Sequence, residues 1–187
     1  RVHQWWTAKQ QAGRTCMLYS YALGKAQRML AALDETVGPI LLHGAVYRMT
    51  EVYRHAGVKL PKYAQADADN ARATRGRALV IAPPSAHGTP WMKKFGPVST
   101  AMASGWMAVR GNRRRRSVDR GFVISDHVDW PALMQTIEAT TAARIGVTHG
   151  HSRQVVRYLQ EQNHEAFIVP TRYAGEADDN TNDQVPA

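Results

Sequence analysis

Short, mostly apolar segments alternate along the chain with segments in which apolar residues recur at helical spacing. Residues 15–19, 39–43 and 78–82 are apolar runs of strand length. Residues 24–33 and 45–55 follow the first two of these runs and carry a helical pattern. Because strands that alternate with helices pair in parallel, this pattern predicts an α/β fold with a parallel sheet.

The remainder of the chain predicts more elements of the same two kinds. Helical patterns cover residues 2–12, 90–95, 131–140 and 152–162, and strand patterns cover residues 100–109, 121–125, 144–148 and 166–169. Residues 61–76 are polar and lack an apolar stripe, which predicts a surface excursion. Trp5, Trp106 and Trp130 are expected in the core, whereas Trp91 is the better candidate for stacking on a nucleic-acid base.

The composition is that of a globular protein with a strong positive charge. The 187 residues are 44% hydrophobic and 21% charged, which is enough to bury one core or two small ones. The net charge is +9, and residues 176–187 contain four acidic and no basic residues, so the rest of the chain carries +13. An excess of this size favours a polyanionic partner.

Several classes of protein are disfavoured by the sequence. No apolar run approaches the ~20 residues of a membrane span, and no signal-peptide pattern is present, so a cytoplasmic protein without membrane contact is expected. Cys16 is the single cysteine, which excludes an internal disulfide and a cysteine-based metal knuckle. Residue 1 falls inside an amphipathic pattern, so we expect the chain to continue a longer one.

Two histidine motifs follow predicted strands and precede predicted helices. The first is Ser125–Asp129, and the second is Thr148–His151. His127 and His149 are 22 residues apart, the length of one strand–helix–strand unit, so neighbouring parallel strands could bring both rings to one cleft. The spacing alone leaves two interpretations open, a metal or catalytic site and a pair of structural histidines.

These motifs resemble those of a known nuclease family. Ser125–Asp129 resembles motif B, and Thr148–Gly150 resembles motif C, of the metallo-β-lactamase/β-CASP nucleases; Tyr21–Gln27 resembles another segment common in these enzymes. Further segments are similar to the ligase-associated exonuclease branch, which is like the mRNA 3′-end processing factors: Ala82–Ser85, Gly88–Met92, Ala103–Met107, Arg113–Arg116 and Val118–Phe122. The resemblance covers residues 2–173 and therefore nearly all of the chain outside its acidic tail.

The resemblance implies a division of the chain into three parts. Residues 1–118 would form an N-terminally truncated β-CASP domain with a parallel sheet. Residues 119–173 would supply the C-terminal strand–helix units of a metallo-β-lactamase fold. Residues 174–187 would be an acidic, disordered tail.

The resemblance also implies roles for individual residues. His149 would complete a site for two zinc ions, and His127 would lie beside the scissile phosphate as a charge-stabilising group or general acid. Ser125 could bind a phosphate oxygen or cap a helix. The family's principal zinc motif, His-x-His-x-Asp-His, is missing from this chain, so the fragment alone is expected to be inactive. His151 is expected at the surface.

The run of arginines at 113–116 is the strongest electrostatic feature of the sequence. Arg110, Arg113, Arg114, Arg115 and Arg116 cannot all face a core. We expect them to contact phosphates of an entering strand without sequence preference, although a solubilising loop is the alternative.

Taken with the resemblance, these features favour a zinc-dependent exonuclease on DNA or RNA ends, in a repair setting, with a DNA ligase as a candidate partner. A histidine at motif C is typical of RNA-processing branches, so the choice of polymer stays open. Two alternatives remain: an inactive nucleic-acid-binding module, and a small α/β scaffold protein whose histidines are incidental.

Overall fold

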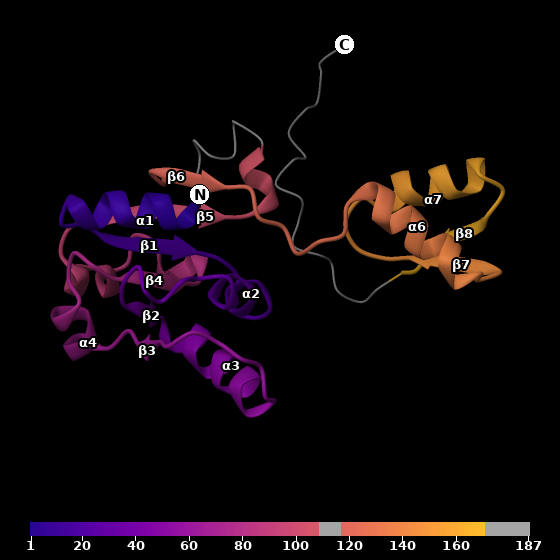
Figure 1. Cartoon of the computed structure of the whole chain (residues 1–187). Helices are drawn as coiled ribbons and strands as arrows, with labels where there is room; N and C mark the ends of the chain where they lie inside the picture. The colour runs from indigo at the N-terminus through magenta and orange to yellow at the C-terminus, as the bar shows by residue number, and fades with distance from the viewer. Residues whose placement is uncertain (109–116, 171–187) are drawn as a thin grey trace, which may run out of the picture. The chain divides into compact units, whose positions relative to one another are not determined.

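The strands form one large and one small parallel sheet (Figure 1). The computed structural model describes residues 1–108 and 117–170. The large sheet has six strands in the order β3-β2-β4-β1-β5-β6, and every neighbouring pair is parallel. These strands are β1 (Thr15–Tyr19), β2 (Ile40–Leu42), β3 (Ala64–Gln65), β4 (Leu79–Ala82), β5 (Val98–Ala103) and β6 (Arg120–Phe122). The parallel α/β fold predicted from the sequence is therefore confirmed.

The helices connect these strands and cover both faces of the large sheet. They are α1 (Val2–Gln11), α2 (Lys25–Ala31), α3 (Gly44–His55) and α4 (Ala68–Ala73), with the 3₁₀ helices η1 (Pro84–Ala86), η2 (Pro90–Phe95) and η3 (Gly105–Ala108). The contacts within the chain divide it into two compact units, with the boundary between His127 and Val128. The large sheet, β6 included, lies in the first unit, whereas the resemblance placed the boundary at residue 118.

Strand β1 lies between β4 and β5 and is buried along its whole length. Its alternate side chains point to opposite faces of the sheet. Cys16 and Leu18 join one apolar cluster with residues of α1, α2 and α3, and Met17 and Tyr19 join a second cluster with residues of α4 and the 3₁₀ helices. Helices on both faces explain why this strand appears in the sequence as a continuous apolar run.

The segment 61–76 contains more regular structure than its polar composition suggested. It forms the edge strand β3 and helix α4, and the side chain of Asp67 caps α4 by accepting a hydrogen bond from the Asn70 backbone N–H at 2.8 Å. Ala66 and Ala71 are buried. Small alanines carry this packing, and they produce only a weak apolar pattern in the sequence.

The tryptophans divide between core and surface in a way that the sequence predicted only in part. Trp5 is buried and packs edge-on against Phe122, as expected. Trp106 is 54% exposed on η3, and Trp130 is 43% exposed, so the prediction that both belong to the core is wrong. Residues 105–108 leave the sheet as a 3₁₀ helix, whereas the sequence predicted that the strand continues to residue 109.

The second unit is a small α/β arrangement of its own. It contains α6 (Trp130–Thr140), β7 (Arg144–Val147), α7 (Ser152–Glu161) and β8 (Glu165–Ile168), and β7 pairs in parallel with β8. Its apolar cluster centres on Val156, Leu159 and Ala166. Within residues 1–108 and 117–170, no helix has the length and apolar character needed to cross a bilayer.

Replacement of Trp6 tests the core of the first unit. Trp6 is fully buried, and its indole N–H donates to the backbone carbonyl of Arg77 at 2.8 Å. We expect Trp6→Ala to lower the free energy of unfolding by about 3–5 kcal/mol, because it leaves a large cavity. Val52 is 62% exposed, so Val52→Ala serves as a control that changes the urea midpoint little. A change in Trp6→Ala as small as the control's would contradict this packing.

Candidate functional site

The carboxyl ends of the parallel strands gather at one edge of the large sheet. Figure 1 shows α2 at this end of β1, and the turn that follows β5 lies at the same end. The segment after β6 is also placed here, because β6 runs parallel to β5 with Ala103 opposite Phe122. In open α/β sheets, ligands and catalytic groups collect at this edge.

The segment Ser125–His127 forms a short turn just beyond β6. The backbone N–H of His127 donates to Ser125 Oγ at 3.2 Å. Ser125 Oγ therefore accepts a hydrogen bond, and its own O–H proton stays able to donate. All three side chains reach solvent, and the ring of His127 makes no hydrogen bond to another described residue.

Two cationic side chains of α2 contact the Ser125–His127 segment. Lys25 is only 2% exposed, and its ammonium Nζ lies 2.8 Å from Asp126 Oδ1. Arg28, one helical turn further on, donates from Nη1 to the backbone carbonyl of Ser125 at 3.1 Å. An ion pair thus joins two segments, Tyr21–Gln27 and Ser125–Asp129. These segments lie about a hundred positions apart in the sequence.

The ion pair fixes the charge of Asp126. Burial by itself would raise the pKa of Asp126, but the hydrogen bond from Lys25 and the positive charge of Lys25 outweigh it, so this pKa lies below its ordinary value. Asp126 is therefore a carboxylate at neutral pH. An anion on this residue cannot itself attract phosphate, which leaves Ser125 and His127 as the groups able to bind one.

In the second unit, His149 follows β7 directly and lies before α7, as the sequence predicted. Its backbone has φ = 63°, and that of Gly150 has φ = 58°, so both residues adopt the left-handed conformation. Thr148 Oγ1 lies 3.1 Å from His149 Nδ1, and Ser152 Oγ donates to the His149 carbonyl at 2.8 Å. His149 is exposed, and the contact with Thr148 engages its Nδ1 atom. His151 is exposed as well, as expected.

His127 belongs to the first unit and His149 to the second, and each is placed within its own unit. The prediction that the two rings meet in one cleft therefore stays a prediction. Among the residues that the structure describes, no three His, Cys, Asp or Glu side chains gather closely enough to hold a metal ion. The arginines Arg110, Arg113, Arg114, Arg115 and Arg116 lie outside the described residues.

A second group of polar and aromatic side chains lies at the same sheet edge, beyond β2 and β4. His43 Nδ1 accepts from the Ala45 backbone N–H at 3.1 Å and so caps α3. Burial, together with the charges of Lys94 and Arg48, lowers the pKa of His43 and favours its neutral ring. The ring of Trp91 packs edge-on against His43 and Phe95, with Lys94 Nζ 4.8 Å from its centroid. These contacts give Trp91 a packing role within the first unit.

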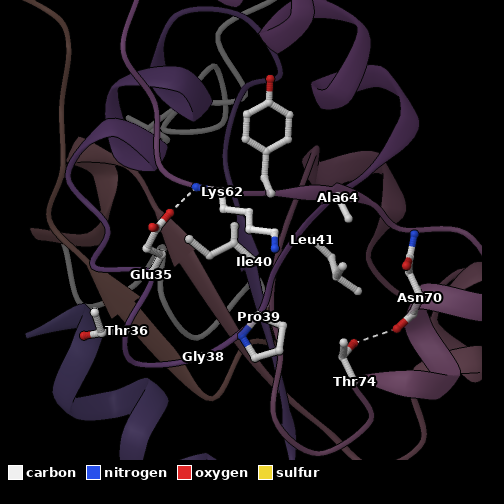
Figure 2. Close-up of a pocket in the computed structure, with 11 residues that line it drawn as sticks. Glu35, Thr36, Gly38, Pro39, Ile40, Leu41, Lys62, Ala64, Asn70 and Thr74 are labelled. Carbon is white, nitrogen blue, oxygen red and sulfur yellow. Dashed lines mark hydrogen bonds between the residues drawn. The ribbon is translucent and has the colours of Figure 1, made fainter.

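A pocket of about 430 Å³ lies at the opposite edge of the sheet, beside the amino end of β2 (Figure 2). The polar groups on its wall are largely satisfied by one another. Glu35 accepts a hydrogen bond from the Lys62 backbone N–H, and Thr74 Oγ1 donates to the Asn70 carbonyl at 2.7 Å. We assign no ligand to this pocket.

The roles of Lys25 and Arg28 were not predicted from the sequence. A lysine at the start of a helix is ordinarily solvent-exposed, so composition and periodicity gave no reason to select Lys25. The available signal was its place within Tyr21–Gln27, a segment noted for its resemblance to the nucleases but not connected to any chemistry.

Comparison with known proteins yields one informative similarity. No protein-family model matches the chain. A protein named probable DNA ligase, from Opitutus terrae, is 31% identical to this chain over 153 residues, which are 82% of the chain. The chain spans about 15% of the length of that relative. The similarity thus covers most of the α/β structure described above and a small part of the other protein.

Proposed function

We propose that this chain is the C-terminal portion of a zinc-dependent phosphodiesterase of the metallo-β-lactamase/β-CASP type, an exonuclease that acts on nucleic-acid ends. The observation that carries the proposal is the meeting of two nuclease-like segments, Tyr21–Gln27 and Ser125–Asp129, at the carboxyl edge of a parallel sheet. If each segment resembled the nucleases only by chance, there would be no reason for the two segments to be in contact.

The fold supports this assignment at a coarse level. The six-stranded parallel sheet would correspond to the β-CASP domain, and the β7–α7–β8 unit would correspond to the returning part of the metallo-β-lactamase domain. The proposal predicts that His127 of the first unit and His149 of the second act on one phosphodiester.

His127 would act directly on the phosphodiester. An exposed imidazole at the end of a turn can donate a proton to the leaving oxygen or stabilise its developing charge. Ser125 would add a hydroxyl donor to a non-bridging oxygen, because its Oγ already accepts from the His127 N–H and retains its proton for a ligand. Both groups lie on a segment whose position is fixed by α2.

His149 fits the role of a zinc ligand in its local geometry. A metal-bound histidine usually has its other ring nitrogen held by a neighbouring group, and Thr148 Oγ1 lies 3.1 Å from Nδ1 here. Zinc, when bound, would polarise the phosphate and lower the pKa of a coordinated water. The described residues do not form a complete site, so most ligands would come from outside this chain.

Two features support nucleic acid as the substrate, and DNA in particular. The chain has a net charge of +9 and a run of four arginines at 113–116, which suits sequence-independent contacts to phosphates. The relative from Opitutus terrae is named a probable DNA ligase. We therefore propose a role at DNA ends in repair, with a ligase as functional partner, and RNA as the alternative polymer.

A second candidate is a nucleic-acid-binding module without catalytic activity. The observation that favours it is the net charge of +9, which suits contacts to phosphates whether or not a metal site is present. It predicts the same salt-dependent binding as the nuclease but no cleavage in any form of the protein.

The arginine run provides the first test. We expect the chain to bind single-stranded oligonucleotides with an affinity that falls steeply with salt. Replacement of Arg113, Arg114, Arg115 and Arg116 by Ala should reduce the salt slope by about 0.7 for each lost phosphate contact. A control with four other exposed cations changed to Ala (Arg48, Arg54, Lys59 and Arg72) removes the same charge. Equal slopes for the wild type and the 113–116 variant would refute the phosphate contacts.

The enzyme is tested by zinc content and cleavage of end-labelled DNA and RNA, measured on this chain and on a form extended at its N-terminus. We expect the extended form to hold zinc and to cleave. His127→Ala should reduce kcat by about 10²–10⁴-fold without loss of zinc, as for a general acid, and His149→Ala should reduce zinc content. An extended form that binds zinc and DNA but does not cleave would establish the binding module instead.

A further inference from the structure

We propose that Lys25 is a positioning residue for His127. Its buried ammonium holds Asp126 and thereby fixes the Ser125–His127 turn at the carboxyl edge of the sheet. The inference rests on the proposed function in one respect only, the action of His127 on a phosphodiester. The other half of the inference, that Lys25 orders this turn, does not depend on any catalytic activity.

The burial of Lys25 is the first observation behind the proposal. A lysine that is 2% exposed has its charge removed from water, which is costly unless a counter-ion lies close. Asp126 Oδ1 at 2.8 Å provides that counter-ion, and the Tyr21 ring lies 5.4 Å from the ammonium. Asp126 comes from the turn after β6 and is itself 34% exposed. Lys25 is therefore the partner held in place by burial, and the ion pair attaches the turn to it through Asp126.

The second observation is that α2 holds two successive residues of the turn. Lys25 and Arg28 are three residues apart and so lie on one face of α2. Lys25 pairs with the Asp126 side chain, while Arg28 donates to the Ser125 backbone carbonyl at 3.1 Å. The side chain of one residue and the backbone of the preceding one are restrained together, and His127 is the next residue along the chain.

The third observation is that the turn lies against two glycines, and most closely against Gly105. Gly24 precedes α2 with φ = 79°, and a Cβ there would come 4.0 Å from Asp126 Oδ2. A Cβ added to Gly105 would come 3.2 Å from the Cβ of Ser125, which is closer than most real contacts. The turn therefore packs between the start of α2 and the start of η3, and the ion pair sets its position within that space.

A purely stabilising role does not account for this arrangement equally well. Lys25 is buried but Asp126 is 34% exposed, so water screens the pair and its net contribution to the free energy of unfolding is expected to be small. The pair does join two distant segments at a defined separation, and one of those segments carries the candidate catalytic histidine.

The test compares Lys25→Met with the wild-type chain by hydrogen–deuterium exchange. Met keeps much of the lysine volume and puts no unpaired charge in the core, so the sheet is expected to persist. We expect amide exchange in residues 120–127, where β6 pairs with β5 and the His127 N–H donates to Ser125 Oγ, to become at least about tenfold faster, as local opening becomes easier, while β1 and β4 stay protected. Lys25→Arg should recover part of the protection. Arg54→Met breaks the exposed Arg54–Glu51 pair on α3 and is the matched control.

Two outcomes would overturn the proposal. One is exchange in residues 120–127 that stays within about twofold of wild type in a folded Lys25→Met chain. The other is an equal loss of protection in β1 and β4, which would make Lys25 a general core residue. Should Lys25→Met fail to fold, Asp126→Asn is measured instead: it removes the charge of the exposed partner, and the same local acceleration supports the proposal while its absence overturns it.

Kinetics then separate positioning from the proposed function itself. In any form of the protein that cleaves nucleic acid, Lys25→Met should reduce kcat by roughly 10²-fold with little change in KM, because His127 is displaced rather than lost. Lys25→Arg should restore part of kcat. If no form cleaves, the proposed function fails, and the exchange result still decides whether Lys25 orders the turn.

Discussion

The parallel pairing of β1 with both β4 and β5 is the constraint on which the rest of the first unit depends. It buries β1 on both faces and brings the carboxyl ends of neighbouring strands to one edge. The segment after β1 and the segment after β6 then lie close enough for Lys25 to reach Asp126. A candidate catalytic turn is thereby attached to the most buried part of the fold, where small displacements are resisted by packing.

The sequence predicted the parts of the fold whose signal is apolar periodicity. Strands β1, β2 and β4 are apolar runs because they are covered on both faces, and α3 has a clear helical stripe. Helix α4 was missed because only small alanines carry its packing. Trp106 and Trp130 were placed wrongly because a large apolar residue in an apolar context does not show whether another element covers it. Whether a tryptophan is covered depends on residues distant in the sequence, which the local apolar pattern does not reveal.

The sequence predicted where the candidate histidines lie relative to strands and helices. It did not predict the contacts from α2 that hold the Ser125–His127 turn. The placement of His149 between β7 and α7 followed from a strand signal and a helix signal on either side of it. The contacts from Lys25 and Arg28 join residues a hundred positions apart, and no pattern along the chain reports such a pairing. The resemblance to nucleases singled out both segments, and the structure supplies the physical reason for them to occur together.

The proposed function predicts that residues 127 and 149, which belong to different units, act on one phosphodiester. Spin labels on Val123→Cys and His151→Cys, two exposed positions that leave both histidines in place, measure this separation in the N-terminally extended form, because the native Cys16 is buried. If His149 holds a zinc ion that contacts a phosphate and His127 hydrogen-bonds the same phosphate, the account predicts a single narrow distribution, with the labelled Cα atoms within roughly 35 Å in the presence of an oligonucleotide. A narrow distribution centred well beyond that separation would contradict it.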